Sequence, residues 1–289
     1  MTIATIDIGG TGIKFASLTP DGKILDKAST PTPKTLEDLL AWLDQRLSEQ
    51  DYSGIAMSVP GAVHQETGVI EGISAIPYIH GFSWYEALSH HKLPVHLEND
   101  ANCVGLSELL AHPEIENAAC VVIGTGIGGA MIINGKLHRG RHGLGGEFGY
   151  MTTIEPAEKL NNWSQLASTG NMVRYVIEKS GQSDWNGRKV YQEAAAGNAL
   201  CQEAIERMNR NLAQGLLNIQ YLIDPDVISL GGSISQNPDF IKGVQKAVDA
   251  FVETYEEYTI APVIQACTYQ ADANLYGALV NWLQEENQW

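Results

Sequence analysis

The chain has 289 residues, a formal net charge of −16 and 44% hydrophobic residues, which is enough for one large or two medium domains with a substantial core. The negative charge argues against a nucleic-acid partner, because such a surface repels phosphates. No apolar run reaches the roughly 18 residues of a membrane span, and no basic region followed by an apolar run indicates a secretory signal. The four cysteines lack C-x-x-C spacing, so we expect reduced thiols in a cytoplasmic protein.

The first segment of the chain alternates apolar runs with turns. Ile3–Ile8 is expected to be a strand, and Asp21-Gly22 to turn the chain into a further strand at Lys23–Ala28. The glycines between the first two runs would weaken a strand unless the backbone must turn or approach something closely. They are Gly9, Gly10 and Gly12.

Helical and strand patterns then follow each other. Leu36–Leu47 has helical periodicity, Gly54–Val59 is apolar and β-rich, and Asp100–Leu110 reads as a helix that ends at His112-Pro113. This mixture of strands and helices predicts an α/β protein.

The second half repeats the pattern of the first. The stretch "AACVVIGTGIGGAMIINGKL" has the order strand, glycine loop, strand, turn and strand, as the N-terminus does, which suggests two related halves. A long helix is expected at Ala199–Ile223, a strand and glycine turn in "DVISLGGSIS", and a last helix in "ADANLYGALVNWLQ".

The glycine loops do not match the common nucleotide motifs. Gly124, Gly126 and Gly129 have G-x-G-x-x-G spacing, but a strand rather than a helix is expected after them, so we reject a dinucleotide site. "GGTGIK" lacks the spacing of a Walker A loop. Two ordinary tight hairpins would explain the glycines, but a repeated pair also suits two concave backbone sites for phosphates.

Several motifs together resemble one family. "DIGGTGIK", "SVPGAV", "ENDANCVGLSE", "VVIGTGIGGAMIINGKLHRG", "GLGGEFGY" and "DPDVISLGGSIS" follow the order seen in the ROK family of sugar kinases and repressors. The resemblance implies two ribonuclease-H-like (actin-like ATPase) α/β domains with a cleft between them. We expect a smaller domain at 1–116 and a larger one at 117–289, whose C-terminal helix (about 272–286) packs back on the first.

The resemblance also implies ATP and Mg²⁺ as cofactors. The residues that it assigns to ATP or phosphate are Asp7, Gly9, Gly10, Thr11, Gly12, Lys14, Thr125, Gly126, Gly231, Gly232 and Ser233. Asp7 would hold Mg²⁺ through water, since this ion keeps much of its hydration. A solvated strand lysine is an equally good reading of Lys14.

The stretch "ENDAN" matches the catalytic turn of the family. By resemblance, Asp100 is the base that takes the proton of a sugar hydroxyl, and Asn99 and Glu147 bind the sugar, which Asp100 also contacts. An acid at this position could instead merely cap the following helix, and Glu147 could be an exposed loop acid.

The chain departs from the family in part of the sugar pocket. Tyr150 replaces a histidine that binds sugar and often zinc, Ser164 replaces a second sugar-binding glutamate, and no cysteine follows in "MTTIEPAEKLNNWSQLAS". We therefore expect no zinc site, because zinc needs closely spaced thiolates or imidazoles. The asparagine of the family's "NLPGW" stretch is also missing near "ISAIPYIHGFSW". We expect Tyr150 to be a sugar-binding residue. The rings of Tyr150 and Trp163 could stack on a group attached at C1 of the sugar.

These features predict an ATP-dependent carbohydrate kinase that phosphorylates O6, with a β-glucoside such as cellobiose as the first candidate. Glucokinase and N-acetylmannosamine kinase are the alternatives. A sugar-responsive repressor is disfavoured by the charge and by the start of the chain at the first strand, and a catalytically dead sugar-binding protein by the retained Asp7 and Asp100. We expect the chain to form a homodimer and to bind a small-molecule sugar or glycoside. We expect no membrane or nucleic-acid partner.

Overall fold

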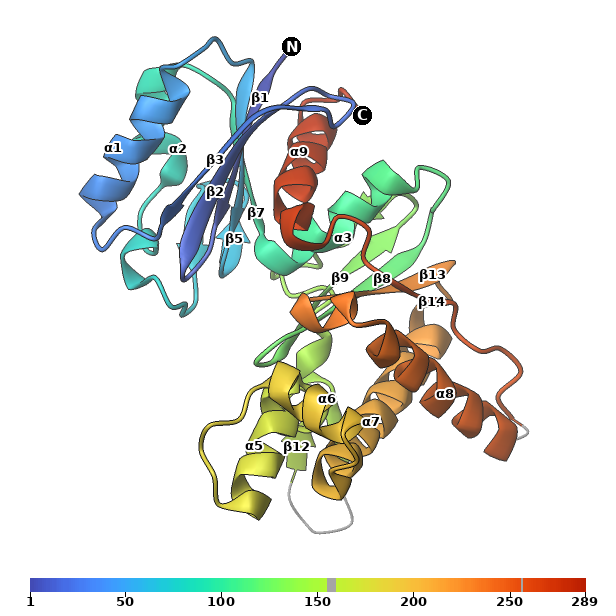
Figure 1. Cartoon of the computed structure of the whole chain (residues 1–289). Helices are drawn as coiled ribbons and strands as arrows, with labels where there is room; N and C mark the ends of the chain where they lie inside the picture. The colour runs from blue at the N-terminus through green and yellow to red at the C-terminus, as the bar shows by residue number, and fades with distance from the viewer. Residues whose placement is uncertain (155–159, 256) are drawn as a thin grey trace. The chain divides into compact units, whose positions relative to one another are not determined.

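The computed structural model describes residues 1–154, 160–255 and 257–289 and divides into two compact units (Figure 1). Unit 1 comprises Met1–Glu114, Arg139–Gly145 and Ala271–Trp289, and unit 2 comprises Ile115–His138 and Gly146–Gln270. The sequence predicts one boundary, at 116/117, and a C-terminal helix that packs on the first domain. The structure assigns the C-terminal residues to unit 1 and, in addition, the segment Arg139–Gly145, which the sequence did not indicate. Both termini therefore belong to unit 1.

Unit 1 is built on a five-stranded sheet in the order β3-β2-β1-β4-β7. Its strands are β1 (Ile3–Ile8), β2 (Gly12–Leu18), β3 (Ile24–Pro31), β4 (Gly54–Val59) and β7 (Val95–Asn99). β1, β4 and β7 run parallel, while β2 and β3 are antiparallel to their neighbours. The carboxyl ends of the three parallel strands thus meet at one edge of the sheet, where ligands of open α/β sheets bind.

Helices cover both faces of this sheet (Figure 1). On one face lie α1 (Leu36–Leu47) and the short α2 (Trp84–Ala87), and on the other α3 (Asp100–Ala111) and α9 (Ala273–Glu285). Strand side chains alternate between the two cores, so that Ile6 packs with α1 and Ile3 packs with α9. The smaller elements of unit 1 are β5 (Ala62–His64), β6 (Val69–Glu71), η1 (Pro77–Ile79) and η2 (Ser89–His91).

Unit 2 repeats the strand order of unit 1, with a sheet in the order β10-β9-β8-β13-β14. Its strands are β8 (Ala118–Ile123), β9 (Ile127–Ile133), β10 (Lys136–Leu137), β13 (Val227–Gly231) and β14 (Ile264–Ala266). Again the first strand forms an antiparallel hairpin with the second and a parallel pair with a later strand. The predicted α/β class and the repeated strand–glycine–strand unit are therefore confirmed.

The helices of unit 2 share one core. α7 (Ala199–Ile223) buries a stripe that includes Leu212 and Leu216 among side chains of the sheet and of the other helices. Those helices are α4 (Trp163–Ala167), α5 (Thr169–Ser180), α6 (Gly187–Ala195) and α8 (Pro238–Thr254). The remaining elements are β11 (Thr152–Ile154), β12 (Leu160–Asn162), η3 (Phe148–Tyr150), η4 (Ser233–Gln236) and η5 (Gln270–Asp272).

Most expected elements are observed within one or two residues of their predicted ends. The third strand is an exception, since it runs from Ile24 to Pro31, three residues beyond the predicted end at Ala28. None of the helices in the described part of the chain is both long and apolar enough to cross a membrane.

Candidate functional site

A hollow of about 510 Å³ lies at the carboxyl edge of the unit 1 sheet. Residues 7–14, which form the end of β1, the glycine turn and the start of β2, supply much of its lining. Pro60, Asp100, Asn274 and residues 29–31 complete the lining. The structure thus gathers around one hollow all the predicted phosphate-binding residues of the first hairpin and the predicted base.

The first glycine hairpin is closed by a hydrogen bond from Gly9 N to Gly12 O of 3.1 Å. A Cβ at Gly9 would lie 2.9 Å from the same oxygen, so glycine is needed for the turn itself. Thr32 Oγ1 donates to Gly9 O at 2.5 Å and holds the hairpin from the side of β3. Gly10 and Thr11, at the tip, are exposed and are available to a ligand.

Asp7 is buried and each of its carboxylate oxygens has a partner. Lys14 Nζ lies 3.1 Å from Oδ2, and Asn274 Nδ2 donates to Oδ1 at 2.9 Å. Lys14 also donates to the backbone oxygen of Ala271. In this structure Lys14 is therefore an ion-pair partner of Asp7 rather than a solvated lysine. Each carboxylate oxygen can accept more than one hydrogen bond, so Asp7 fits a magnesium ion bound through water.

Asn99, not Asp100, caps helix α3. Asn99 Oδ1 accepts from Ala101 N at 2.9 Å and from Asn102 N at 3.2 Å, and its Nδ2 donates to Gly61 O at 3.0 Å. Asp100 is the first helical residue and lines the hollow. Helix capping was the alternative, non-catalytic role for Asp100. Asn99 already fills that role.

The environment of Asp100 makes its carboxylate more basic. Burial raises the pKa of Asp100 above its ordinary value, the negative charge of Asp7 raises the pKa further, and the backbone N–H of Ala101 partly offsets both effects. A carboxylate with a raised pKa is a stronger proton acceptor in its charged form. Asp100 can therefore act as a general base on a hydroxyl placed in the hollow.

A partly buried ion pair that the sequence analysis missed supports the Asn99–Asp100 turn. Glu98 is 2% exposed, and its Oε1 accepts from Asn99 N and from Asn102 Nδ2, both at 2.8 Å. Arg139 Nε donates to Glu98 Oε2 at 2.6 Å. Arg139 lies in the segment that returns to unit 1, so this return of the chain fixes the turn that carries Asp100.

Arg139 is itself held by the C-terminal helix. Its Nη2 donates to Asn281 Oδ1 at 2.7 Å and to Glu285 Oε1 at 3.0 Å, both on α9. Burial by itself lowers the pKa of the Arg139 guanidinium, but the charges and hydrogen bonds of Glu98 and Glu285 together outweigh it and raise that pKa above its ordinary value. The only sequence signal for this residue is its place in "KLHRG", within one of the stretches that resemble the family.

The second glycine hairpin, in unit 2, is closed by a backbone hydrogen bond across a turn that is one residue shorter than the first. Gly124 N donates to Gly126 O at 2.9 Å, and Thr125 and Gly126 at the tip are exposed. Ser164 Oγ accepts from Ile127 N at 2.9 Å and donates to Ile127 O at 3.2 Å. The single hydroxyl proton of Ser164 is therefore used to anchor the hairpin.

The turn after β13 lies against this hairpin. Gly232 has φ +89°, and a Cβ there would lie 2.2 Å from Ile123 O at the end of β8. Gly231 is buried and Ser233 is exposed. Unit 2 therefore brings together Thr125, Gly126 and the turn of Gly231, Gly232 and Ser233, all of which the resemblance assigns to ATP.

Glu147 follows Gly146, whose backbone lies directly against the backbone of β9. Gly146 has φ +89°, and a Cβ there would lie 2.9 Å from Met131 N, while a Cβ at Gly149 would lie 2.0 Å from Ile127 O. Glu147 is half-buried between these two close approaches. It is therefore not the freely exposed loop acid considered as an alternative.

The two aromatic residues expected to stack on a sugar have different environments. Tyr150 is 72% exposed and its ring is accessible. Trp163 is 1% exposed, and its Nε1 donates to Asn211 O at 2.8 Å. The prediction for Trp163 is wrong, because the indole fills the core against Gly215 of α7. Part of the cysteine-free stretch considered for zinc, residues 155–159, lies outside the described residues.

Comparison with known proteins places the chain among sugar kinases. The sequence profile of the ROK family matches residues 3–285. A β-glucoside kinase of Listeria monocytogenes is 34% identical over 300 aligned residues, with 100% of this chain and 99% of the relative covered. A glucokinase of Halalkalibacterium halodurans is 29% identical, with 98% and 95% covered. The crystal structure of a ROK family protein from Streptococcus pneumoniae TIGR4 in complex with sucrose is 89% identical, with a TM-score of 0.98 and 100% of both chains covered.

Proposed function

The chain belongs to the ROK family, and from this premise we propose that it is a carbohydrate kinase that transfers the γ-phosphoryl group of ATP to a primary hydroxyl, O6, of its sugar. The observation that carries the proposal is the position of Asp100. Its carboxylate has a raised pKa and faces the hollow that the first glycine hairpin also lines. A base beside a backbone phosphate site is what phosphoryl transfer to an alcohol requires.

In the proposed reaction, Asp100 takes the proton of O6 as this oxygen bonds to the γ-phosphorus of ATP. The bond between the γ-phosphorus and the bridging oxygen breaks, and ADP leaves. The protein contributes position and charge stabilisation rather than covalent chemistry. The backbone N–H groups of the exposed hairpin tips, at Gly10–Thr11 and Thr125–Gly126, would serve the phosphates.

The remaining predicted residues have supporting roles in this proposal. Asp7 would hold Mg²⁺ through water, and this ion neutralises phosphate charge when it is bound. Lys14 would act through its ion pair with Asp7. The adenosine would lie at the turn Gly231, Gly232 and Ser233. The sugar would be held by Glu147 and by the second amide hydrogen of Asn99.

We propose a β-glucoside as the substrate because Tyr150 and Ser164 replace two sugar-binding residues that, by resemblance to the family, lie toward C1 of the sugar. The Ser164 hydroxyl is already bound to the backbone of Ile127, so it has no proton left for a C1 hydroxyl. A buried polar group that binds the C1 hydroxyl is left unpaired when a sugar without that hydroxyl binds, which costs binding free energy. When the protein lacks such groups, this cost disappears and a sugar substituted at C1 can bind. The exposed ring of Tyr150 offers a stacking face for the group attached at C1.

The named relatives support the same class of substrate. One of them is a β-glucoside kinase. The 89% identical protein was crystallised with sucrose, whose glucose is α-linked, so this structure supports a glycoside but not the β-linkage. Free glucose is the alternative, because another full-length relative is a glucokinase.

The substrate class is tested by steady-state kinetics with ATP and a panel of sugars. We expect higher kcat/KM for cellobiose or an aryl β-glucoside than for glucose, N-acetylmannosamine or sucrose. A tenfold preference for glucose or N-acetylmannosamine, which corresponds to about 1.4 kcal/mol, would overturn the β-glucoside assignment and leave the kinase proposal standing. A preference for sucrose would keep a glycoside pocket but change the linkage that it selects.

The second hairpin can be tested with Gly126→Ala. A Cβ at this position would lie 3.5 Å from Ser164 Oγ, which is an ordinary contact, so the variant should unfold at the parent temperature. The methyl group would obstruct the backbone concavity, and we expect KM for ATP to rise about tenfold, a loss of about 1.4 kcal/mol. KM for the sugar is the internal control. An unchanged KM for ATP would exclude this hairpin from the phosphate site.

We further propose that the chain acts as a cytoplasmic homodimer and contains no zinc site of the family's cysteine type. The homodimer rests on the resemblance to the family. The cytoplasmic location rests on the four buried free cysteines, which suit a reducing compartment. Light scattering on the purified chain measures the assembly directly, and a monomer at micromolar concentration would refute the dimer.

A further inference from the structure

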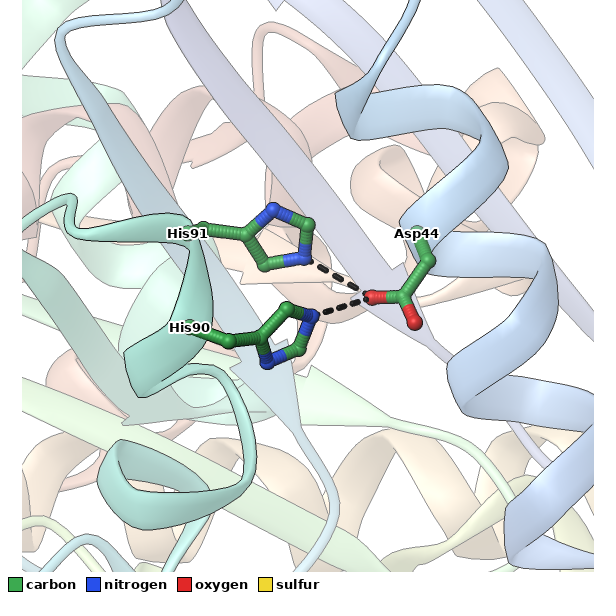
Figure 2. Close-up of side chains that lie close together, drawn as sticks. All are labelled: Asp44, His90 and His91. Atoms are coloured by element: carbon green, nitrogen blue, oxygen red, sulfur yellow. Dashed lines mark hydrogen bonds and ion pairs between the residues drawn. The ribbon is translucent and has the colours of Figure 1, made fainter.

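Two adjacent histidines and one aspartate converge on a single point of unit 1, and the proposed function uses none of them (Figure 2). Asp44 lies in the last turn of α1, and His90 and His91 form the end of η2. We call these three residues the His–Asp cluster. They lie apart from the hollow, since none of them lines it.

Both imidazole rings turn the same nitrogen toward the same carboxylate oxygen. His90 Nε2 lies 3.1 Å and His91 Nε2 lies 2.8 Å from Asp44 Oδ1, as Figure 2 shows. The two ring centroids are 4.1 Å apart, and one donor atom from each residue lies within 4.8 Å of the others. Three donor atoms of the types that bind transition metals therefore face one another.

The spacing of the donor atoms is close to that of a metal site. Ligands at about 2.0–2.2 Å from a tetrahedral ion lie about 3.3–3.6 Å from one another. The nitrogen–oxygen distances of 3.1 and 2.8 Å need to widen by less than about 1 Å to reach this range. The side chains of His90 and Asp44 are 56% and 44% exposed, so they are free to make this adjustment and water can fill the remaining positions.

The geometry points to a binding site for one borderline divalent cation, with Zn²⁺ as the ion of choice, on the His–Asp cluster. Imidazole nitrogens and a carboxylate oxygen suit zinc and the neighbouring transition metals, whereas magnesium and calcium prefer oxygen donors. In the ion-free state, two Nε2–H groups would donate to the carboxylate. In the metal-bound state, the same nitrogens would be unprotonated ligands.

The bound ion would join α1 to η2, which lie more than forty residues apart in the sequence. Such a link stabilises the folded state by mass action, because the unfolded chain does not hold the three donors together. The proposal departs from the expectation that the protein binds no zinc, which rested on the missing cysteine cluster. It concerns other residues, and it is independent of the proposed kinase function.

The test is titration calorimetry of the untagged, chelator-treated chain with ZnCl₂ in excess MgCl₂. We expect one Zn²⁺ per chain and an increase in the unfolding temperature when ZnCl₂ is added. Asp44→Asn and His91→Gln should each weaken Zn²⁺ binding at least tenfold and abolish that increase. His90→Gln, at the most exposed position of the cluster, provides a third variant should either of the others fail to fold.

The matched control is His112→Gln. His112 Nδ1 lies 3.4 Å from Glu114 Oε1, so this pair offers one imidazole and one carboxylate without a second histidine. The control should bind Zn²⁺ like the parent. Binding that is unchanged in the cluster variants, equally weakened in the control, absent from the parent, or limited to one ion per two chains would overturn the proposal.

Discussion

Asp100→Asn should lower kcat by about 10²–10⁴-fold, the usual contribution of a general base, while KM for the sugar and for ATP stays near the parent values. An amide cannot accept the proton of O6, but it preserves the size of the side chain and can still accept from the N–H of Ala101, as Asp100 does at 2.8 Å. Steady-state kinetics with the preferred glycoside measure the effect. A variant with near-parental kcat would show that another group is the base.

The same substitution should leave stability unchanged or increase it. Because burial and Asp7 raise the folded-state pKa of Asp100, the folded chain binds this proton more tightly than the unfolded chain. The folded state therefore loses stability as the pH rises from the ordinary aspartate pKa through the raised value. At neutral pH the charged carboxylate is unfavourable, and the amide removes that penalty. A large drop in unfolding temperature would instead indicate a structural role.

The raised pKa of Asp100 also predicts the acid side of the pH–rate profile. Asp100 must be unprotonated to act as a base, so kcat/KM should fall as the pH decreases through its raised pKa. The midpoint should lie above the ordinary aspartate value of about 3.9.

Arg139→Met should both destabilise unit 1 and lower kcat. The substitution removes the 2.6 Å contact to Glu98 Oε2 and leaves a buried carboxylate with fewer donors. Breaking a fully buried pair costs about 3–5 kcal/mol, and we expect about 2–3 kcal/mol here because Arg139 is 27% exposed. Since Glu98 Oε1 also binds Asn99 N, the turn that carries Asp100 should lose its fixed position.

Urea denaturation and kinetics test the two effects of Arg139→Met together. Arg210→Met is the matched control, because Arg210 Nη2 lies 3.6 Å from Glu206 Oε1 and their side chains are 63% and 77% exposed. Such a surface pair contributes about 0–1 kcal/mol. If Arg139→Met were as stable and active as the control, the support that we assign to Glu98 and Arg139 would be refuted.

Local features of the fold could be predicted from the sequence. The run Ile3–Ile8, the helix Leu36–Leu47 and the long helix Ala199–Ile223 match the observed elements, because apolar periodicity and turn residues act over a few positions. The repeated strand–glycine–strand pattern predicted the shared topology of the two sheets. Gly9 could be read in the same way, since its requirement arises within the turn.

Long-range contacts around the candidate site could not be predicted. Asn274 binds Asp7 across 267 positions and Arg139 binds Glu98 across 41 positions, and no local pattern encodes such pairs. The prediction for Trp163 failed for a related reason. Aromatic character is compatible with a binding face or with a core, and the space beside Gly215 of α7 decides for the core.

The most direct test of the central claim is to identify the product formed from ATP and a β-glucoside by phosphorus and carbon NMR. We expect one ADP for each phosphorylated glycoside, with the phosphate on O6 of the non-reducing glucose. The matching 6-deoxy glycoside, which lacks the accepting hydroxyl, should give no product. A phosphate at another position, or ADP release that is equal with the 6-deoxy compound, would contradict phosphoryl transfer to a primary hydroxyl at Asp100.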